Sequence, residues 1–379
     1  MTASKNPFFF RELPLEAPFC DRERELHELT RYAEGKANIV LFSPRRFGKT
    51  SLVKHVQQKL AERGYITLYA DLFGVSSIDD VAARLAKAVF EITHKKESIF
   101  QKAIRFIQAF RPVLNPDPLG GVSLSVETTS QRKVGIELLE EMLVSLGTFA
   151  ESVEGKLHVV LDEFQEIVEL KEARSCEGIL RSHIQRHPFS YFFVGSRRRV
   201  LLSMFNEKKR PFFQSAINYE LSALPHDDLI LFLEQMFQQG GKPCSQAIAA
   251  SIAQEVDHHP YYAQKLSFFL YELSEEKIAQ GDLAKAMRRL IESERPVFEA
   301  LLQGLAPKQI ALLEAIARDP TTSLFSLEYM KKHELGSTGG VQGALKRLHL
   351  LDLVEQDDAK RWSVVDPIFC RWLTDRSPK

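Results

Sequence analysis

Two residues near the N-terminus, Lys49 and Thr50, are of the types that hold a triphosphate and its metal ion. They follow a glycine in the segment FSPRRFGKTS at 42–51, which lies between an apolar run at 38–41 and a helix-like run at 51–56. Strand, glycine-containing loop and helix is the order in which backbone N–H groups and a helix N-terminus can surround phosphate. Lys49 would then contact the β- and γ-phosphates, and the Thr50 hydroxyl would bind Mg²⁺. The pattern predicts a site for a nucleoside triphosphate.

Ser43 departs from the strict pattern G-x-x-x-x-G-K-[ST], which has glycine at its position. Glycine allows unusual backbone angles and close approach of the chain to phosphate, and serine is small enough to fit. A chance Gly-Lys-Thr at a helix start is the alternative, because threonine can cap a helix and glycine is common in turns. The flanking strand and helix favour the phosphate loop. The loop residues expected to line the nucleotide are Pro44, Arg45, Arg46, Phe47, Gly48, Lys49, Thr50 and Ser51.

An apolar run at residues 157–161 ends in two carboxylates, Asp162 and Glu163. Continuous apolar runs are typical of parallel strands buried on both faces, and ligands of open α/β sheets bind at the carboxyl ends of such strands. Asp162 is therefore the candidate to support Mg²⁺, and Glu163 is the candidate base that orients the attacking water. A strand that ends in a solvated acidic turn is the alternative, which the loop at Lys49 disfavours.

The bulk composition is that of a globular protein of two or three domains. The 379 residues are 44% hydrophobic and 26% charged. Lys and Arg together number 50, as do Asp and Glu, so a nucleic-acid contact would need a local basic patch. The cysteines at 20, 176, 244 and 370 are scattered and support neither a zinc site nor a disulfide framework. We expect a cytoplasmic protein, because neither a signal peptide nor a membrane span is evident.

The order of apolar runs divides the chain into four segments. A Pro- and Phe-rich lead-in precedes alternating strand-like and helix-like runs, and Asp21 is expected to cap the first helix. Within these runs, residues 112–130 read as an irregular insert with a short strand or hairpin. Strand-like runs stop near residue 225, where several helices begin. The expected domains are a lead-in at 1–20, an α/β core at 21–224, a helical lid at 225–300 and a winged helix at 301–379.

The C-terminal segment has the order helix, helix, helix and two-stranded ribbon, which is the order of a winged helix-turn-helix. Its third helix-like run carries Lys346 and Arg347, whereas the turn between the strand-like runs carries Asp357 and Asp358. Acidic residues in that turn disfavour a strong contact with phosphate, so DNA and protein both remain open as partners. The helix-like runs lie at 307–317, 326–332 and 337–348, and the strand-like runs lie at 353–355 and 362–365.

Taken together and in this order, the motifs resemble the archaeal-type ATPases, members of the STAND branch of the AAA+ P-loop NTPases. The resemblance spans nearly the whole chain and is specific as a set. It rests on FCDREREL at 19–26, PRRFGKTSL at 44–52, YADLF at 69–73, LDEFQ at 161–165, GSRR at 195–198, HPYY at 259–262 and DPIFCRWL at 366–373.

The resemblance implies an α/β fold: a P-loop NTPase core of AAA+/STAND type with a parallel sheet, a helical lid and a C-terminal winged helix. It implies ATP or ADP with Mg²⁺ as ligands, and it places Arg22 and Glu23 near the adenine and ribose. It also places His259, with Pro260 beside it, at the phosphates. The glycine usual before this histidine is His258 here.

Two further roles follow from the same resemblance. In such ATPases a strand beside the acidic strand ends in a polar residue that senses the γ-phosphate, and Ser196 or Arg197 is the candidate. The alternative for Arg197 is a basic turn at a helix start. Arg210 lies near where trans-acting arginines lie in other AAA+ proteins, with a solvated basic turn as the alternative.

The sequence is therefore compatible with two alternative functions. The first is a slow, Mg²⁺-dependent, ATP-hydrolysing switch whose nucleotide state is coupled to the placement of the lid and the winged helix. The second is a DNA-associated ATPase whose winged helix binds duplex. Neutral overall charge and the acidic turn favour the first. Its partners would be ATP or ADP and a protein or a second copy of the chain, with no membrane. A nucleotide-binding scaffold without turnover is weaker, because Asp162 and Glu163 are both present.

Overall fold

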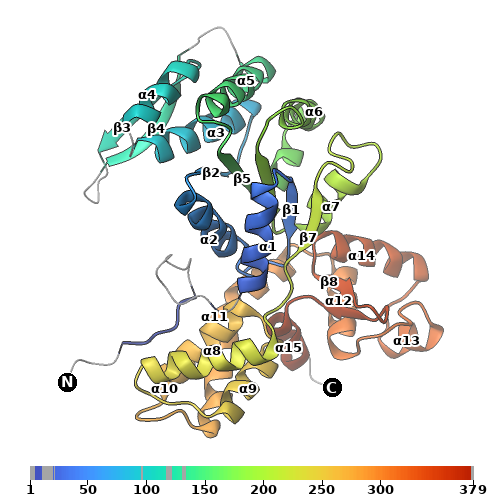
Figure 1. The fold of residues 1–379 in the computed structure, drawn as a ribbon. Coiled ribbons are helices and arrows are strands. Elements are labelled where there is room, and N and C mark those ends of the chain that lie inside the picture. Colours follow the sequence, from blue (N-terminus) through green and yellow to red (C-terminus); the bar gives the residue numbers. More distant parts are fainter. Residues whose placement is uncertain are drawn as a thin grey trace. The chain divides into compact units, whose positions relative to one another are not determined.

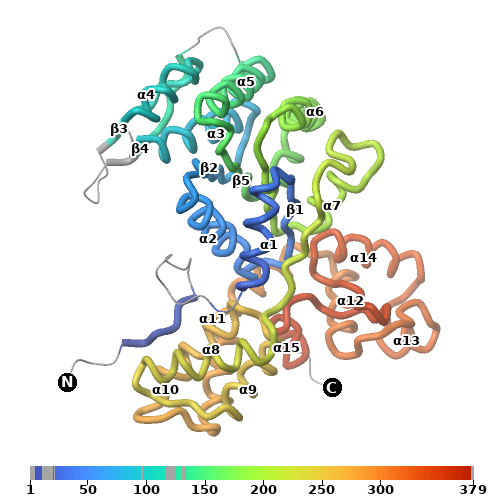
Figure 2. The backbone as a smooth tube through the Cα atoms, in the orientation of Figure 1, coloured from blue at the N-terminus to red at the C-terminus, as the bar shows by residue number. Residues whose placement is uncertain are grey.

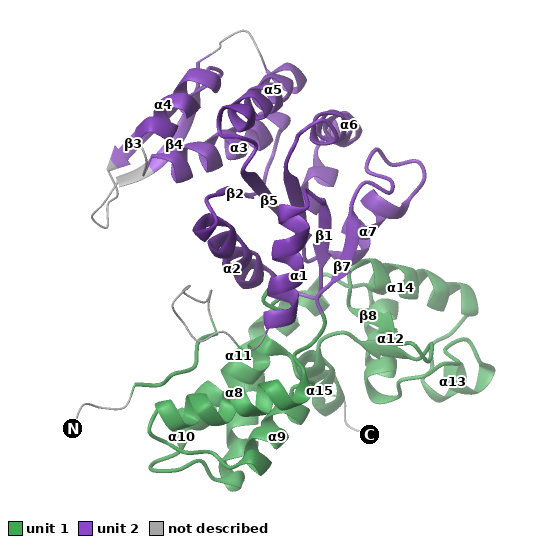
Figure 3. Ribbon diagram, viewed as in Figure 1, with its two compact units in different colours: residues 1–21, 46–48, 222–379 green, residues 22–45, 49–221 purple. Residues whose placement is uncertain are grey.

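The chain divides into two compact units, which Figure 3 colours separately. The structure is a computed structural model that describes residues 5–10, 20, 22–94, 97–116, 122–129 and 134–376. One unit, here called the sheet unit, comprises residues 22–45 and 49–221. The other, here called the helical unit, comprises residues 1–21, 46–48 and 222–379. Asp21, the expected cap of the first helix, lies outside the described residues.

A five-stranded parallel sheet forms the centre of the sheet unit, in the order β2-β5-β6-β1-β7. Three of its strands are buried along their whole length, as their continuous apolar sequences predict. The register pairs Asp71 with Asp162 and Phe42 with Gly195, so the carboxyl ends of β1, β2, β5 and β6 lie at one edge. The strands are β1 (Ile39–Phe42), β2 (Ile66–Asp71), β5 (Leu157–Asp162), β6 (Ser190–Gly195) and β7 (Ile217–Glu220).

Helices accompany the strands of the sheet, as Figure 1 shows. Each of the strands β1, β2, β5 and β6 is followed by a helix, and these alternations give the unit its α/β character. Rings of Phe164, Phe193, Phe205 and Phe212 contact one another in its core. The helices are α1 (Glu23–Glu34), α2 (Lys49–Glu62), α3 (Ile78–Thr93), α4 (Glu97–Phe106), α5 (Ile136–Ser152), α6 (Ala173–Ile184) and α7 (Arg198–Asn206), with a 3₁₀ turn, η1 (Phe164–Glu169).

An antiparallel hairpin interrupts the α/β alternation between α4 and α5, where the sequence indicates an irregular insert. Its strands are β3 (Phe110–Pro116) and β4 (Val122–Thr128), and their register places Leu114 opposite Leu124. An exposed ion pair between Arg111 and Glu127, 2.6 Å apart, spans the two strands. The tube in Figure 2 shows the hairpin beside α3 and α4. The expected hairpin is therefore confirmed.

Helices dominate the helical unit, and one apolar core runs through it from Phe8 to Leu373. In its C-terminal part, three helices and a two-stranded ribbon follow in the predicted order. The expected domain bounds at 224, 225, 300 and 301 remain predictions. The elements are α8 (His226–Gln239), α9 (Gln246–Glu255), α10 (Pro260–Leu273), α11 (Gln280–Gln303), α12 (Pro307–Arg318), α13 (Leu327–Lys332), α14 (Thr338–Leu350), β8 (Val354–Gln356), β9 (Trp362–Val364) and α15 (Pro367–Arg376).

The carboxylate of Asp366 joins α10 to α15 inside the helical unit. Asp366 accepts backbone N–H bonds from Ile368 and Phe369, both 2.9 Å long, and so caps the start of α15. Its second oxygen accepts the hydroxyl of Tyr262 at 2.6 Å. Burial raises the pKa of Asp366, and these hydrogen bonds oppose the rise. No helix within the described ranges is long and apolar enough to cross a membrane.

Candidate active site

The loop between β1 and α2 has an uncommon backbone at two positions. Gly48 has φ +86° and Arg46 has φ +65°, both in the left-handed region. Glycine adopts such angles without steric cost, whereas a residue with a Cβ atom is strained there. Helix α2 begins at Lys49, so its N-terminus faces the loop. This is the geometry in which N–H groups converge on an anion.

Lys49 is held inside the loop by three oxygen acceptors. Its Nζ lies 3.0 Å from the carbonyl oxygen of Ser43, 3.1 Å from Ser43 Oγ and 2.9 Å from the carbonyl oxygen of Pro44. Only 7% of Lys49 is exposed. Burial lowers its pKa to about 8, against the opposing charges of Glu163 and Asp162. Ser43, which breaks the sequence pattern, is therefore a partner of this lysine.

Thr50 and Asp162 meet at the carboxyl edge of the sheet, as the sequence predicts. The Thr50 hydroxyl donates to Asp162 Oδ2 at 3.0 Å, and the N–H of Glu163 donates to Asp162 Oδ1 at 2.9 Å. The Tyr69 hydroxyl, at the end of β2, donates to the same Oδ2. Burial raises the pKa of Asp162, and the three hydrogen bonds partly offset this. Tyr69 is a site residue that the sequence analysis missed, although it lies in the YADLF segment.

Glu163 follows Asp162 in a left-handed conformation, with φ +49°. Ser196 Oγ donates to Glu163 Oε2 at 3.1 Å, and the side-chain amide of Gln165 donates to the same oxygen. Gln165 is itself buried against Gly195, where a Cβ atom would overlap Gln165 Oε1. Gly195 therefore leaves room for the amide that orients Glu163. Gln165 was also missed from the sequence.

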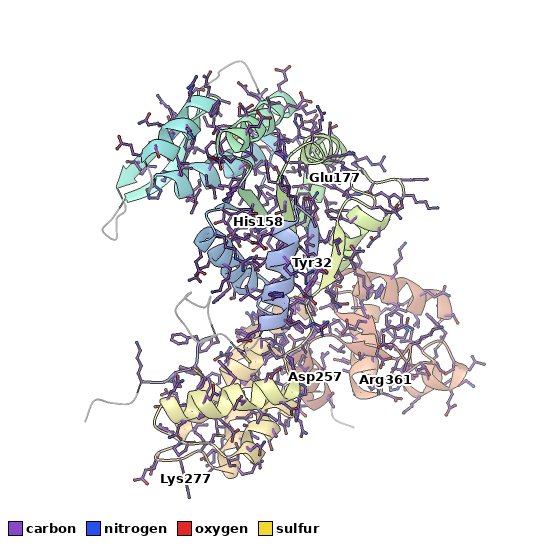
Figure 4. The ribbon with its side chains drawn as sticks, in the orientation of Figure 1. Tyr32, His158, Glu177, Asp257, Lys277 and Arg361 are labelled. Atoms are coloured by element: carbon purple, nitrogen blue, oxygen red, sulfur yellow. The ribbon has the colours of Figure 1, made fainter. Side chains whose placement is uncertain are left out.

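Two predicted arginines lie apart from this cluster. Arg197 pairs with Glu166 at 3.0 Å and Glu169 at 2.9 Å on η1, an arrangement that does not bring it to Glu163. Arg210 Nη2 lies 2.6 Å from Oε1 of Glu177, which is wholly buried and is labelled in Figure 4. Arg210 is thus a core ion-pair partner in this structure. The expectation of a solvated basic turn is wrong for it, and the geometry does not support a free arginine finger.

Four further predicted residues lie at helix starts. Arg22 occupies the N-cap position of α1 and pairs with Glu25 at 2.8 Å, and Glu23 is the first residue of α1. His259 occupies the N-cap position of α10, and Pro260 is its first residue, the position at which the missing N–H of proline costs nothing.

Phe47, a residue of the P-loop that packs with the helical unit, contacts His259 edge to face. Their ring centroids lie 4.6 Å apart, and the centroid of the Tyr262 ring also lies 4.6 Å from that of His259. His259 is buried. The structure therefore brings the predicted His259 to a residue of the predicted phosphate loop.

The donor set at Thr50 and Asp162 fits Mg²⁺. Both residues offer oxygen ligands 3.0 Å apart, and Mg²⁺ prefers oxygen and retains several waters or substrate phosphates in its shell. Among the described residues no group of three or more His, Cys, Asp or Glu side chains could hold a metal ion. A site with one or two protein ligands is the arrangement that these residues can provide.

The parallel sheet, the loop ahead of α2 and the acidic end of β5 together define a P-loop nucleoside-triphosphatase fold. Residues 19–194 match the model of a family described as an ATPase domain predominantly from Archaea. Residues 296–375 match a probable winged helix domain. The first of these matches covers the loop, the acidic strand end and most of the sheet.

Solved structures of other proteins have a similar fold, and one relative matches a short part of the sequence. An ATP-binding protein of Methanocaldococcus jannaschii, MJ0147, is 32% identical over 90 residues, which is 23% of each chain. The Walker-type ATPase PABY2304 of Pyrococcus abyssi has a TM-score of 0.71 at 19% identity, over 97% of this chain and 99% of that one. The ORC2 protein of Aeropyrum pernix, in ADPNP–ADP complexes, has a TM-score of 0.60 at 16% identity, over 97% and 96%.

Proposed function

We propose that this protein binds ATP with Mg²⁺ at the carboxyl edge of its sheet and hydrolyses it. The observation that carries the proposal is the hydrogen bond of 3.0 Å between Thr50 and Asp162, which joins the phosphate loop to the acidic strand end. Lys49 lies in the same loop, and Glu163 is the next residue of the acidic strand. These residue types in this arrangement suit phosphoryl transfer to water.

Each side chain has a role that its contacts favour. Lys49 is buried, so little water screens its positive charge. It would neutralise negative charge on the transferred phosphoryl group. Thr50 and Asp162 would hold Mg²⁺, which when bound neutralises phosphate charge. Glu163 would orient the attacking water and accept its proton. Ser196 donates to Glu163 and would fix its direction, as well as sense the γ-phosphate.

The test is steady-state ATP turnover and equilibrium nucleotide binding in the full chain. Lys49→Ala should weaken ATP binding at least tenfold, because the buried charge is lost. Glu163→Gln should keep ATP affinity within about threefold and lower turnover at least a hundredfold, since the water loses its base. Tight binding by Lys49→Ala, or normal turnover by Glu163→Gln, would each remove the corresponding assignment.

The nucleotide state would also act as a switch on the helical unit. P-loop residues 46–48 pack with that unit, and Phe47 contacts His259 at the start of α10. Tyr262, one turn further on, binds Asp366 at the start of α15. A change in the loop on hydrolysis would therefore reach the winged helix through adjoining side chains. Hydrogen exchange should then differ between the ADP and ATPγS complexes at α10 and α15; equal exchange there would contradict the switch.

Binding of duplex DNA is the second candidate function. The winged helix match and the exposed Lys346 and Arg347 on α14 favour it. Arg361, in the turn between β8 and β9, forms an ion pair with Asp357 at 3.1 Å, which leaves less free positive charge there. If DNA binds through α14, its affinity should fall with salt, and replacing both Lys346 and Arg347 by alanine should reduce the salt dependence. Affinity unchanged by the double replacement would exclude α14 as the contact.

A further inference from the structure

A buried carboxylate on α11, Glu294, gathers three donors within the helical unit. Lys265 Nζ lies 2.6 Å from Glu294 Oε1, the Tyr261 hydroxyl donates to the same oxygen at 2.8 Å, and Arg46 Nη1 lies 3.2 Å from Oε2. Only 2% of Glu294 is exposed. Burial alone would raise its pKa, but the hydrogen bonds from Lys265 and Tyr261 and the charges of Lys265 and Arg46 hold the pKa below its ordinary value. Glu294 is therefore a buried anion with an arginine of the P-loop among its partners.

Arg46 has a second contact at the same place. Its guanidinium lies 4.1 Å from the centroid of the Tyr261 ring, within the range of a cation–π interaction. The hydroxyl of that same tyrosine binds Glu294, so ring and carboxylate are fixed relative to each other. The end of the Arg46 side chain is thus held from two sides, although the side chain is half-exposed.

The backbone of Arg46 needs such an anchor. With φ +65° it lies in the left-handed region, where a side chain crowds the following carbonyl. A strained backbone conformation of this kind persists when several contacts with the surrounding structure hold it in place. Gly48, at φ +86°, has no such cost. The direction of the N–H groups after Arg46 depends on its backbone angles, and these are groups that face phosphate in such a loop.

We propose that Glu294 is a positioning residue for nucleotide binding, which acts through Arg46 to hold the middle of the P-loop in its left-handed conformation. The inference rests on the proposed function, because it concerns how the same loop receives phosphate. In this account the anchored Arg46 side chain stabilises the left-handed backbone conformation of the loop. If the guanidinium instead attracted phosphate directly, alanine and glycine at position 46 would weaken binding equally.

The experiment compares alanine and glycine at position 46, with ATPγS affinity measured by calorimetry on the full chain. Arg46→Ala keeps the backbone strain and loses the anchor, so its Kd should rise about tenfold, which corresponds to about 1.4 kcal/mol. Arg46→Gly loses the anchor and the strain together, so its Kd should be at least about threefold lower than that of Arg46→Ala. Equal losses in both variants would overturn the proposal and assign the guanidinium itself to phosphate.

Glu294→Gln, made in the parent and in the Arg46→Gly background, gives a double-mutant cycle for these two positions. In the parent it should raise Kd about tenfold and raise KM with kcat nearly unchanged, and in the Arg46→Gly background it should change Kd less than twofold. An equal effect in both backgrounds would show a general loss of folding and would overturn the proposal. Arg45→Ala and Arg45→Gly are the matched controls, because Arg45 does not have positive φ. Glycine should confer no advantage over alanine there.

Failure of the proposed function has a separate signature. If the parent chain binds no ATPγS, or if Lys49→Ala binds as tightly as the parent, the site itself is wrong, whatever happens at position 46. If the parent binds, Lys49→Ala does not, and alanine and glycine at 46 behave alike, only the role of Glu294 is wrong. Thermal unfolding without nucleotide, measured for every variant, identifies any variant that fails to fold. The comparison of Arg46→Ala with Arg46→Gly tests the proposal without replacing Glu294, so it holds even if Glu294→Gln does not fold.

Discussion

Lys49 has an acid–base equilibrium that nucleotide binding must shift. Its pKa is about 8 because the side chain is buried, and phosphate favours the protonated form. Binding above pH 8 would therefore require uptake of a proton, whereas binding below pH 8 would not. We expect the Kd for ATPγS to be flat from pH 6.5 to 7.5 and to rise by up to tenfold per pH unit above about pH 8.

Calorimetry in buffers of different ionisation enthalpy measures this proton uptake. Lys49→Arg is the control, because arginine stays charged throughout the range. Its binding should be weaker and independent of pH between 7 and 9.5. The same slope in the arginine variant would assign the proton to another group.

Gly195 controls the orientation of Glu163 through its neighbour Gln165. A Cβ atom there would overlap Gln165 Oε1 and would lie 3.1 Å from Leu201 Cδ2. Gly195→Ala should therefore displace the amide that binds Glu163 and lower kcat about tenfold, with Kd for ATPγS within about twofold. Gly178→Ala on α6 is the control, because nothing lies within 4 Å of the added methyl group, and it should leave kcat unchanged. An unaffected kcat in Gly195→Ala would show that Gln165 does not position the base.

At the scale of elements, β5 and β6 enclose an uncharged histidine. His158 on β5, labelled in Figure 4, is fully buried, and its Nδ1 lies 2.8 Å from Ser190 Oγ on β6. Burial lowers its pKa to about 3, so the folded state binds its proton less tightly than the unfolded chain. Stability should therefore fall as pH drops from about 6.5 towards 3, by up to about 1.4 kcal/mol per pH unit from this residue.

Denaturant unfolding followed by circular dichroism between pH 4 and pH 7 measures this slope. His158→Asn keeps a hydrogen-bonding side chain without a titrating group, and it should flatten the slope by about one proton. His187, whose pKa burial lowers to about 4, contributes in the same direction, so some slope should remain. A slope unchanged by His158→Asn would contradict the neutral buried state.

The elements that the sequence predicts best are those with a strong local pattern. Strands β1, β5 and β6 are continuous apolar runs, and α3 has its N-cap at Ser77, whose side chain accepts the N–H of Asp80. Strand β7 was missed because it has four residues, three of them exposed, and it exists through pairing with β1. Its strand character comes from a neighbour and not from its own sequence.

The same distinction holds for the candidate site. Lys49, Thr50, Asp162 and Glu163 were predictable because loop and strand-end motifs have fixed spacing. Tyr69 was not, because a strand pattern says which face a side chain occupies but not which distant oxygen its hydroxyl reaches. Contacts between residues far apart in sequence, such as Arg46 and Glu294, have no local signal at all.

At the scale of the whole molecule, the two units have separate apolar cores. Separate cores predict two unfolding transitions in denaturant. Both tryptophans of the chain, Trp362 and Trp372, lie in the helical unit, so tryptophan fluorescence should follow that unit alone. Circular dichroism should follow both.

Substitutions in each apolar core should show which unfolding transition belongs to which unit. Phe298→Ala removes a buried ring that packs on Phe369 and Trp372, and it should lower the fluorescence midpoint through a loss of about 3–5 kcal/mol. Phe164→Leu, in the aromatic core of the sheet unit, should shift the second transition seen by circular dichroism and leave the fluorescence midpoint in place. A single transition that moves with both substitutions would show that the units unfold together.

Because the P-loop is divided between the two units, truncation or proteolysis of the chain would affect the loop. The chain passes from one unit to the other at residues 21–22, 45–46, 48–49 and 221–222, so no single cut separates the two. A fragment that ends at residue 221 keeps Arg46 and Phe47 but lacks Glu294 and His259, against which they pack. Proteolysis or truncation at this boundary would therefore yield a nucleotide domain whose own phosphate loop has lost part of its support.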